Sequence, residues 1–247
     1  KRQLLLCAAC EFMDSSLGMG YGTTLTPVLL LLGYAPLDLV PAILISEFLT
    51  GISAALFHHG EGNVDLSFRS AHGRTALLLA ACSVVGVAAG VGLALNVPGR
   101  LLRTLIGMII VGAGVVILVL RNWSVRYRGP AIALLGVLAS FNKAVSGGGY
   151  GPLLTSGQIV SGVEGRAAIG ITSLAEGVTC MVAGGLYLAS GPPLDLSLVA
   201  VVSCGALLAV PATAQVVRRT SERRLKLVIG LLTLFMGGLT LFKTWVL

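Results

Sequence analysis

Residues 76–95 read ALLLAACSVVGVAAGVGLAL, an apolar run with no charged side chain. A helix needs about 20 such residues to cross the hydrocarbon core of a bilayer. Over all 247 residues, 55% are hydrophobic and 11% are charged, whereas soluble domains carry roughly 25% charged residues. A transmembrane β-barrel would instead show short segments of alternating polarity. The sequence therefore predicts an all-α integral membrane protein.

Composition also narrows the possible partners and chemistry. The formal net charge of +7 arises mainly from short basic segments between apolar runs, which orient membrane proteins, so we expect membrane lipid and no nucleic acid as a partner. The five cysteines are odd in number and scattered, and they imply no disulfide framework. The histidines match no standard zinc spacing. We expect no metal, no cofactor and, because we find no nucleophile–base constellation, no enzymatic activity.

The chain contains one unit twice. Gly20-Tyr21-Gly22 reappears as Gly149-Tyr150-Gly151, a shift of 129 that also carries Glu47 onto Glu176. Near the end of each half, an RLLRTLIG segment resembles a later RRLKLVIG segment, at residues 100–107 and 223–230. The sequence thus predicts two transmembrane repeats, residues 1–122 and 129–247, in one membrane domain.

Each half is expected to hold one glycine-interrupted stretch and three ordinary spans. If the interrupted stretch crosses the membrane, the repeats are parallel; if it dips in and returns, they are inverted. The inverted arrangement can place eleven Lys and Arg residues on the cytoplasmic face and five on the other, as the positive-inside rule favours. We therefore prefer inverted repeats, each with a re-entrant helix pair. The expected spans are residues 39–57, 75–95, 105–120, 169–189, 198–217 and 227–245.

The interrupted stretches, SLGMGYGTTLTP at residues 16–27 and SGGGYGPLLTS at 146–156, are candidate anion sites. Proline in each suits the first turn of a new helix, whose free amides and dipole attract anions. The alternative is that the glycines only allow close helix packing. The expected substrate-binding residues are Gly20, Tyr21, Gly22, Thr23, Thr24, Asn142, Lys143, Gly148, Gly149, Tyr150 and Gly151.

Ionisable groups inside apolar spans are costly and are functional candidates by default. Lys143 could supply positive potential to an anion, or could belong to a structural ion pair. Burial favours the neutral form of a carboxyl group, so Glu47, Glu176 and Asp14 are expected to carry coupling protons; capping a neighbouring hydroxyl is the alternative for the two glutamates. Glu11, close to the start, is expected near the membrane interface.

These segments resemble the TauE/SafE family of sulfite exporters, also called TSUP transporters. The resemblance rests on GMGYG at residues 18–22, PVLLLLGYAP at 27–36, GGGYGPLL at 147–154, and the two basic, leucine-rich segments. The chain departs from the family where GMGYG replaces a run of three glycines and where Thr155-Ser156 replaces a proline. The resemblance implies transport of sulfur-containing anions such as sulfite or organosulfonates, coupled to protons, in the bacterial inner membrane.

Together, these features predict a secondary transporter that works by alternating access, with the anion held between the two interrupted stretches. An anion channel is the alternative, since it would use similar helix ends without a coupling residue.

Overall fold

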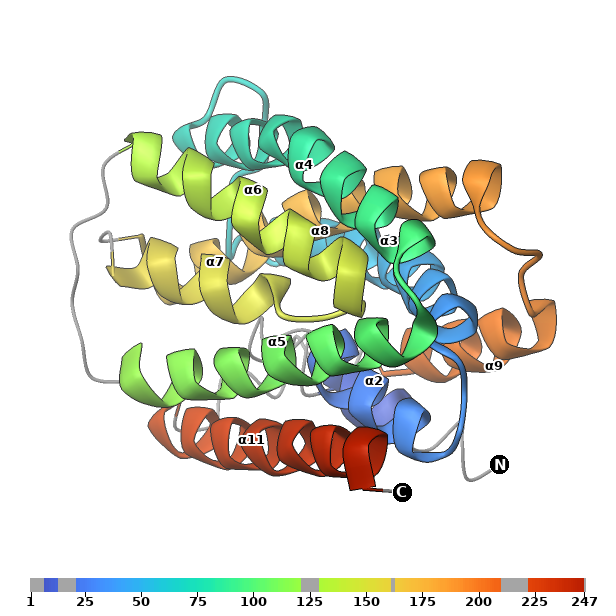
Figure 1. The fold of residues 1–247 in the computed structure, drawn as a ribbon. Coiled ribbons are helices and arrows are strands. Elements are labelled where there is room, and N and C mark those ends of the chain that lie inside the picture. Colours follow the sequence, from blue (N-terminus) through green and yellow to red (C-terminus); the bar gives the residue numbers. More distant parts are fainter. Residues whose placement is uncertain (1–6, 13–20, 121–128, 161–162, 210–221, 247) are drawn as a thin grey trace.

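The computed structural model describes residues 7–12, 21–120, 129–160, 163–209 and 222–246. These residues form helices joined by turns, with no strand among them, so the all-α prediction is confirmed for this part of the chain. Residues 7–12 are helical, and nine longer helices follow within the described ranges (Figure 1). They are α2 (Tyr21–Leu31), α3 (Pro36–Gly60), α4 (Ala71–Asn96), α5 (Gly99–Leu120), α6 (Gly129–Ser146), α7 (Tyr150–Val160), α8 (Gly165–Ser190), α9 (Leu196–Leu207) and α11 (Glu222–Val246).

Three of the described helices, α3, α4 and α8, are long and apolar enough to cross a membrane. Large apolar side chains on their outer faces are exposed, including Leu77, Val84 and Val85 on α4 and Met181 on α8. In water such a surface would be unfavourable, whereas in lipid it is the expected exterior of a membrane protein.

Two pairs of helices at corresponding positions in the two halves of the sequence, α5 with α11 and α3 with α8, pack in antiparallel orientation. A Cβ on Gly107 of α5 would lie 2.7 Å from the side chain of Leu241, and one on Gly114 would lie 2.8 Å from that of Leu234. Residue numbers fall along α11 as they rise along α5, so the two helices are antiparallel. Small residues allow the backbones of membrane helices to approach this closely.

The pair α3 and α8 follows the same pattern. A Cβ on Gly51 would lie 3.1 Å from Gly177, and one on Gly184 would lie 3.5 Å from Ile45. These two helices carry Glu47 and Glu176, so their close antiparallel contact brings the two acidic side chains to neighbouring positions in the protein.

The interruption predicted in the second half is confirmed. Helix α6 ends at Ser146 and α7 begins at Tyr150, and α7 packs back against α6 (Figure 1). Gly147 and Gly149 have φ values of 71° and 79°, a conformation that glycine adopts without steric cost. In the first half, the described part of α2 starts at Tyr21, and residues 13–20, which hold most of the glycine motif, lie outside the described part.

The described parts of α2 and α7 contain 11 residues each, which is roughly 16 Å of helix at 1.5 Å per residue, against about 30 Å of hydrocarbon. That the two helices belong to re-entrant segments stays a prediction.

One expected span is wrong in its length. The span predicted over residues 198–217 corresponds to α9, which ends at Leu207, and the chain turns at Leu208 and Ala209. Pro211 follows, and the residue before a proline is disfavoured in helical conformation. The hydrophobic run therefore continues beyond the point where the helix stops.

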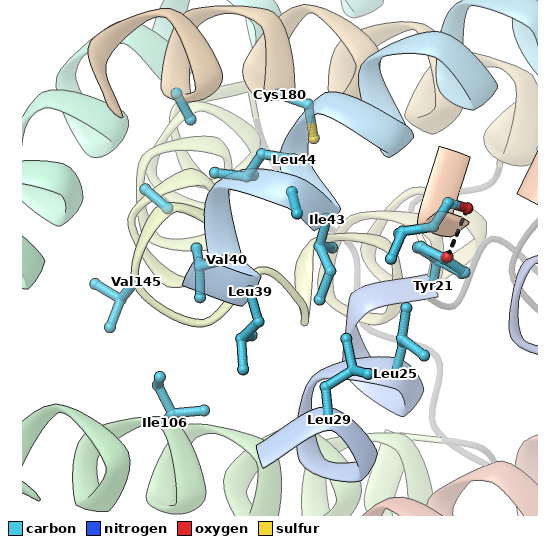
Figure 2. Packing of buried hydrophobic residues seen from close by; sticks show 14 of the residues in the cluster. Tyr21, Leu25, Leu29, Leu39, Val40, Ile43, Leu44, Ile106, Val145 and Cys180 are labelled. Atoms are coloured by element: carbon cyan, nitrogen blue, oxygen red, sulfur yellow. Dashed lines mark hydrogen bonds between the residues drawn. The ribbon is translucent and has the colours of Figure 1, made fainter. Parts of the chain in front are cut away.

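The apolar core surrounds the start of α2. Tyr21, Leu25 and Leu29 project from α2 towards Leu39 and Ile43 of α3 (Figure 2). The Tyr21 hydroxyl donates a hydrogen bond of 3.2 Å to the backbone carbonyl of a residue on α9, position 202, which satisfies its polar group within the core. The beginning of α2 is thereby fixed in the interior of the protein.

Candidate functional site

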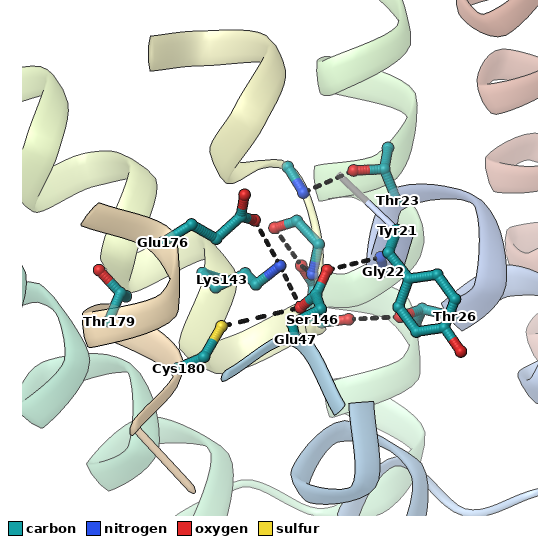
Figure 3. A network of polar contacts seen from close by, with 12 residues as sticks. Tyr21, Gly22, Thr23, Thr26, Glu47, Lys143, Ser146, Glu176, Thr179 and Cys180 are labelled. Carbon is teal, nitrogen blue, oxygen red and sulfur yellow. Dashed lines mark hydrogen bonds and ion pairs between the residues drawn. The ribbon is translucent and has the colours of Figure 1, made fainter. Parts of the chain in front are cut away.

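The last turn of α6 places Lys143 in a buried ion-pair network (Figure 3). Its Nζ lies 2.7 Å from Oε1 of Glu176 on α8 and also contacts Oε2 of Glu47 on α3. The Lys143 side chain is fully buried, and the two carboxylate side chains are 2% and 7% exposed. A lysine can remain charged at this depth only because opposite charges surround it.

Glu47 also contacts the beginning of α2. The Gly22 amide donates a hydrogen bond of 3.0 Å to Glu47 Oε1. This amide belongs to the first turn of α2, where backbone N–H groups have no partner within the helix and the helix dipole favours negative charge. The carboxylate of Glu47 therefore lies between a helix N-terminus and an ammonium group, a setting suited to an anion.

The start of α2 packs directly on the glycine interruption of the second half. A Cβ on Gly22 would overlap the carbonyl of Gly147, and a Cβ on Gly148 would lie 2.5 Å from the amide nitrogen of Thr23. The Gly149 amide donates a hydrogen bond of 2.7 Å to Thr23 Oγ1. The Thr26 hydroxyl donates one of 2.9 Å to the Ser146 carbonyl. Glycine is required here because two backbones touch.

The remaining predicted residues divide into four groups. Tyr21 and Thr24 donate their hydroxyl hydrogens to backbone carbonyls. Asn142 lies beside Gly149, and its buried Oδ1 has no hydrogen-bond partner among the described residues. Tyr150 and Gly151, which begin α7, are buried. The last group, Gly20 and Asp14, lies outside the described residues. A substrate contact for any of these residues stays a prediction.

The sequence analysis does not place two neighbours of the network, Glu11 and Cys180, at this site. Glu11, expected near the interface, is instead 1% exposed and lines a cavity with Glu47 and Glu176. The signal for Glu11 was present, because an acidic residue within an apolar run is costly wherever it lies. Cys180, whose Sγ lies 3.8 Å from Glu47 Oε2, has no such signal because a buried cysteine usually packs as a small apolar side chain.

The cavity beside the network is small. Its volume is about 10 Å³, roughly the space that one water molecule needs. It is lined by Glu11, Glu47, Thr50, Gly51, Ala54, Ser173 and Glu176. A sulfonate does not fit in this conformation, so anion binding at this position requires the ion pairs to separate. Within the described residues, no group of His, Cys, Asp and Glu side chains has an arrangement that could hold a metal ion.

Comparisons with known proteins agree with these features. The family described as "Sulfite exporter TauE/SafE" matches residues 4–240. A relative from Bacillus subtilis (strain 168), named "Probable membrane transporter protein YtnM", is 25% identical over 248 aligned residues, which cover 96% of this chain and 80% of the relative. No solved structure matches the chain. Because the family match covers nearly the whole sequence, the resemblance is confirmed: this integral membrane protein is a transporter of the sulfite exporter TauE/SafE family.

Proposed function

We propose that the protein is a secondary transporter that exports sulfur-containing anions, sulfite or organosulfonates, in exchange for or together with protons. The observation that carries this proposal is the position of the Glu47 carboxylate. One oxygen accepts a hydrogen bond from the Gly22 amide, and the other contacts Lys143 Nζ. A sulfonate or sulfite group presents the same kind of oxygen atoms to the same two donors.

The charge of the network links anion binding to a proton. With both glutamates ionised, Lys143, Glu47 and Glu176 carry a formal net charge of −1, which repels an incoming anion. A proton on Glu47 cancels the charge of that side chain, so its carboxyl group can leave Lys143 and the Gly22 amide. A monovalent anion then takes its place, and the net charge of the site stays −1. We therefore propose that one proton binds with each monovalent anion.

Alternating access would arise from movement of one repeat against the other. The antiparallel pairing of α3 with α8 and of α5 with α11 supports inverted repeats over residues 1–122 and 129–247. So does the reversal of the chain between α6 and α7. The Lys143–Glu47 contact joins α6 of the second repeat to α3 of the first, so its separation would accompany the movement.

The substrate class and direction rest on the family. Its description refers to sulfite export, and the bacterial relative is described as a probable membrane transporter. We therefore propose the cytoplasmic membrane of a bacterium as the location. Purified protein should be screened for thermal stabilisation by sulfite, sulfate, thiosulfate and short sulfonates, because a ligand stabilises the state that it binds.

Proteoliposomes provide the test of coupling. A pH gradient should drive accumulation of the anion that the screen identifies, against its own concentration gradient. Glu47→Gln should abolish accumulation driven by the pH gradient, because an amide cannot gain or lose the proton. Glu176→Gln applies the same test to the other carboxylate that contacts Lys143. If both variants retain the full response to the pH gradient, neither glutamate provides the coupling.

An anion channel is the second candidate, because a helix N-terminus and a lysine also occur in anion-selective pores. A channel dissipates gradients and gives ionic current without accumulation. Measuring accumulation and current in the same proteoliposomes separates the two functions.

A further inference from the structure

A second basic site lies away from Lys143, where the end of α2 meets the start of α5 and the end of α11 (Figure 1). It is a cavity of about 220 Å³, lined by Leu30, Leu31, Gly33, Arg103, Thr240, Lys243 and Thr244. The lining includes two cationic side chains and two hydroxyl groups, and none of the described residues that line it is acidic. This composition favours a negatively charged ligand.

The two cations retain hydrogen-bonding capacity. Lys243 Nζ donates a bond of 2.6 Å to the Leu31 carbonyl, which uses one of the three N–H groups of an ammonium. Arg103 Nε is buried and has no hydrogen-bond partner among the described residues. A buried donor without a partner is unfavourable, and a ligand oxygen would satisfy it. Two converging cations with free N–H groups suit a tetrahedral oxyanion such as phosphate.

The surroundings of the cavity are those of a membrane–water interface. Arg100 stacks 4.6 Å from the ring centroid of Trp245, whose Nε1 donates to Thr104 Oγ1 at 3.1 Å. The side chains of Leu32 and Leu101 nearby in sequence are exposed. Tryptophan and basic residues concentrate at this depth of the bilayer, and basic pockets between transmembrane helices bind the headgroups of anionic lipids.

We propose that this cavity binds the phosphate group of an anionic phospholipid. Arg103 and Lys243 provide the charge and the N–H donors, and the exposed leucines contact the acyl chains. Because the end of α11 and the end of α2 both line the cavity, a bound lipid would hold these two helices together. The proposal uses none of the residues assigned to anion transport, so each can fail without the other.

Native mass spectrometry of the purified full-length chain in detergent can test the proposal with two probes that share acyl chains, phosphatidylglycerol and phosphatidylcholine. Phosphatidylglycerol should bind more tightly. Arg103→Gln and Lys243→Gln should each weaken its binding about five-fold, as expected for one basic residue near the membrane surface. Arg69→Gln is the matched control, because Arg69 is an exposed cation in the loop between α3 and α4.

Two further measurements keep the result interpretable if a variant is poorly folded. Lys243→Arg, which keeps both the charge and a donor for Leu31, should retain the preference for phosphatidylglycerol. Sodium phosphate tested on the delipidated protein reports binding of a free anion. Equal binding of the two lipids, an equal effect of Arg69→Gln, or stabilisation by free phosphate that matches that by phosphatidylglycerol would each overturn the assignment to a lipid.

Discussion

Lys143 Nζ and Glu176 Oε1 lie 2.7 Å apart, although the two residues are separated by 33 positions and belong to different helices, α6 and α8. Glu47, which the shift of 129 relates to Glu176, contacts the same ammonium. One lysine therefore connects a pair of sequence-related glutamates, one from each half. The two carboxylates already balance the positive charge of Lys143, so this lysine can attract an anionic substrate only after one carboxylate has been neutralised.

Replacing Lys143 by methionine should destabilise the protein strongly. The variant would leave Glu47 and Glu176 buried without their cation, and breaking a buried ion pair in this way costs about 3–5 kcal/mol. The melting temperature in detergent should fall, and transport should be lost.

The triple variant Lys143→Met, Glu47→Gln, Glu176→Gln is the control for this loss. It removes all three charges together, so much of the stability should return, whereas transport should stay absent. A single Lys143→Met variant that melts at the wild-type temperature would contradict a buried pair at this position.

A methyl group at Gly22 should prevent the two halves from packing. Its Cβ would overlap the backbone carbonyl of Gly147, which cannot rotate away. Gly92 is the matched control, because it also lies within a helix, α4, and a Cβ there meets nothing within 4 Å. Gly22→Ala should lower the yield of monodisperse protein in size-exclusion chromatography. Gly92→Ala should be neutral or stabilising by up to about 1 kcal/mol, since alanine has the higher helix propensity.

A folded, active Gly22→Ala variant would show that the contact between α2 and the second glycine interruption can be relaxed at little cost. Transport by the Gly92→Ala variant sets the reference for that comparison.

The helices of this fold follow from local sequence signals. Long apolar runs predict α3, α4 and α8, and the sequence GGGYGP predicts the interruption before Tyr150, because glycine tolerates the positive φ values found there. Hydropathy and glycine content are properties of one segment, so they predict a helix or its interruption without knowledge of the neighbouring helices. The hydropathy of the sequence does not predict the end of α9, because the apolar run continues beyond Leu207, where the helix ends.

The partners within the site could not be predicted in the same way. Their position inside apolar runs marks Glu47 and Lys143 as functional candidates, but which side chains meet depends on how each helix is rotated and where it crosses its neighbours. The proximity of Cys180 to Glu47 and the burial of Glu11 arise from this tertiary packing. The sequence therefore identifies the charged candidates, and the structure shows which of them contact one another.

Asp65, in the loop between α3 and α4, should not contribute to the pH dependence of stability near neutrality. Hydrogen bonds from Ser67, the backbone amide first, lower the pKa of exposed Asp65 from its ordinary value. A carboxyl group with a lowered pKa in the folded state stabilises that state above its unfolded pKa of about 3.9, and this effect is lost as the pH falls through the folded pKa. Asp65→Asn and wild-type protein should therefore show the same pH profile of melting temperature from pH 5 to 8 and differ only in acid. Different profiles near pH 7 would contradict this assignment.

Two adjacent threonines offer the sharpest test of the contact between the halves. Thr23 Oγ1 accepts the hydrogen bond from the Gly149 amide, whereas the Thr24 hydroxyl donates to the Tyr21 carbonyl within its own helix. Thr23→Val leaves a buried N–H group without a partner, which costs about 1–3 kcal/mol. Thr24→Val removes a local bond and a contact with the thiol of Cys10, a weak hydrogen-bonding group, so its cost should be below about 1 kcal/mol.

Both substitutions keep the shape of the side chain and lie on the same turn of α2. The difference in stability between the two variants therefore reports the hydrogen bond between Thr23 and Gly149, which connects the two halves. Chemical unfolding in detergent should place Thr23→Val below Thr24→Val in stability. Transport should decrease more for Thr23→Val, because Gly149 belongs to the interruption that faces the Lys143 network. Equal stability of the two variants would mean that the Gly149 amide finds another acceptor, and the position of α2 would then depend on backbone packing at Gly22 and Gly148 alone.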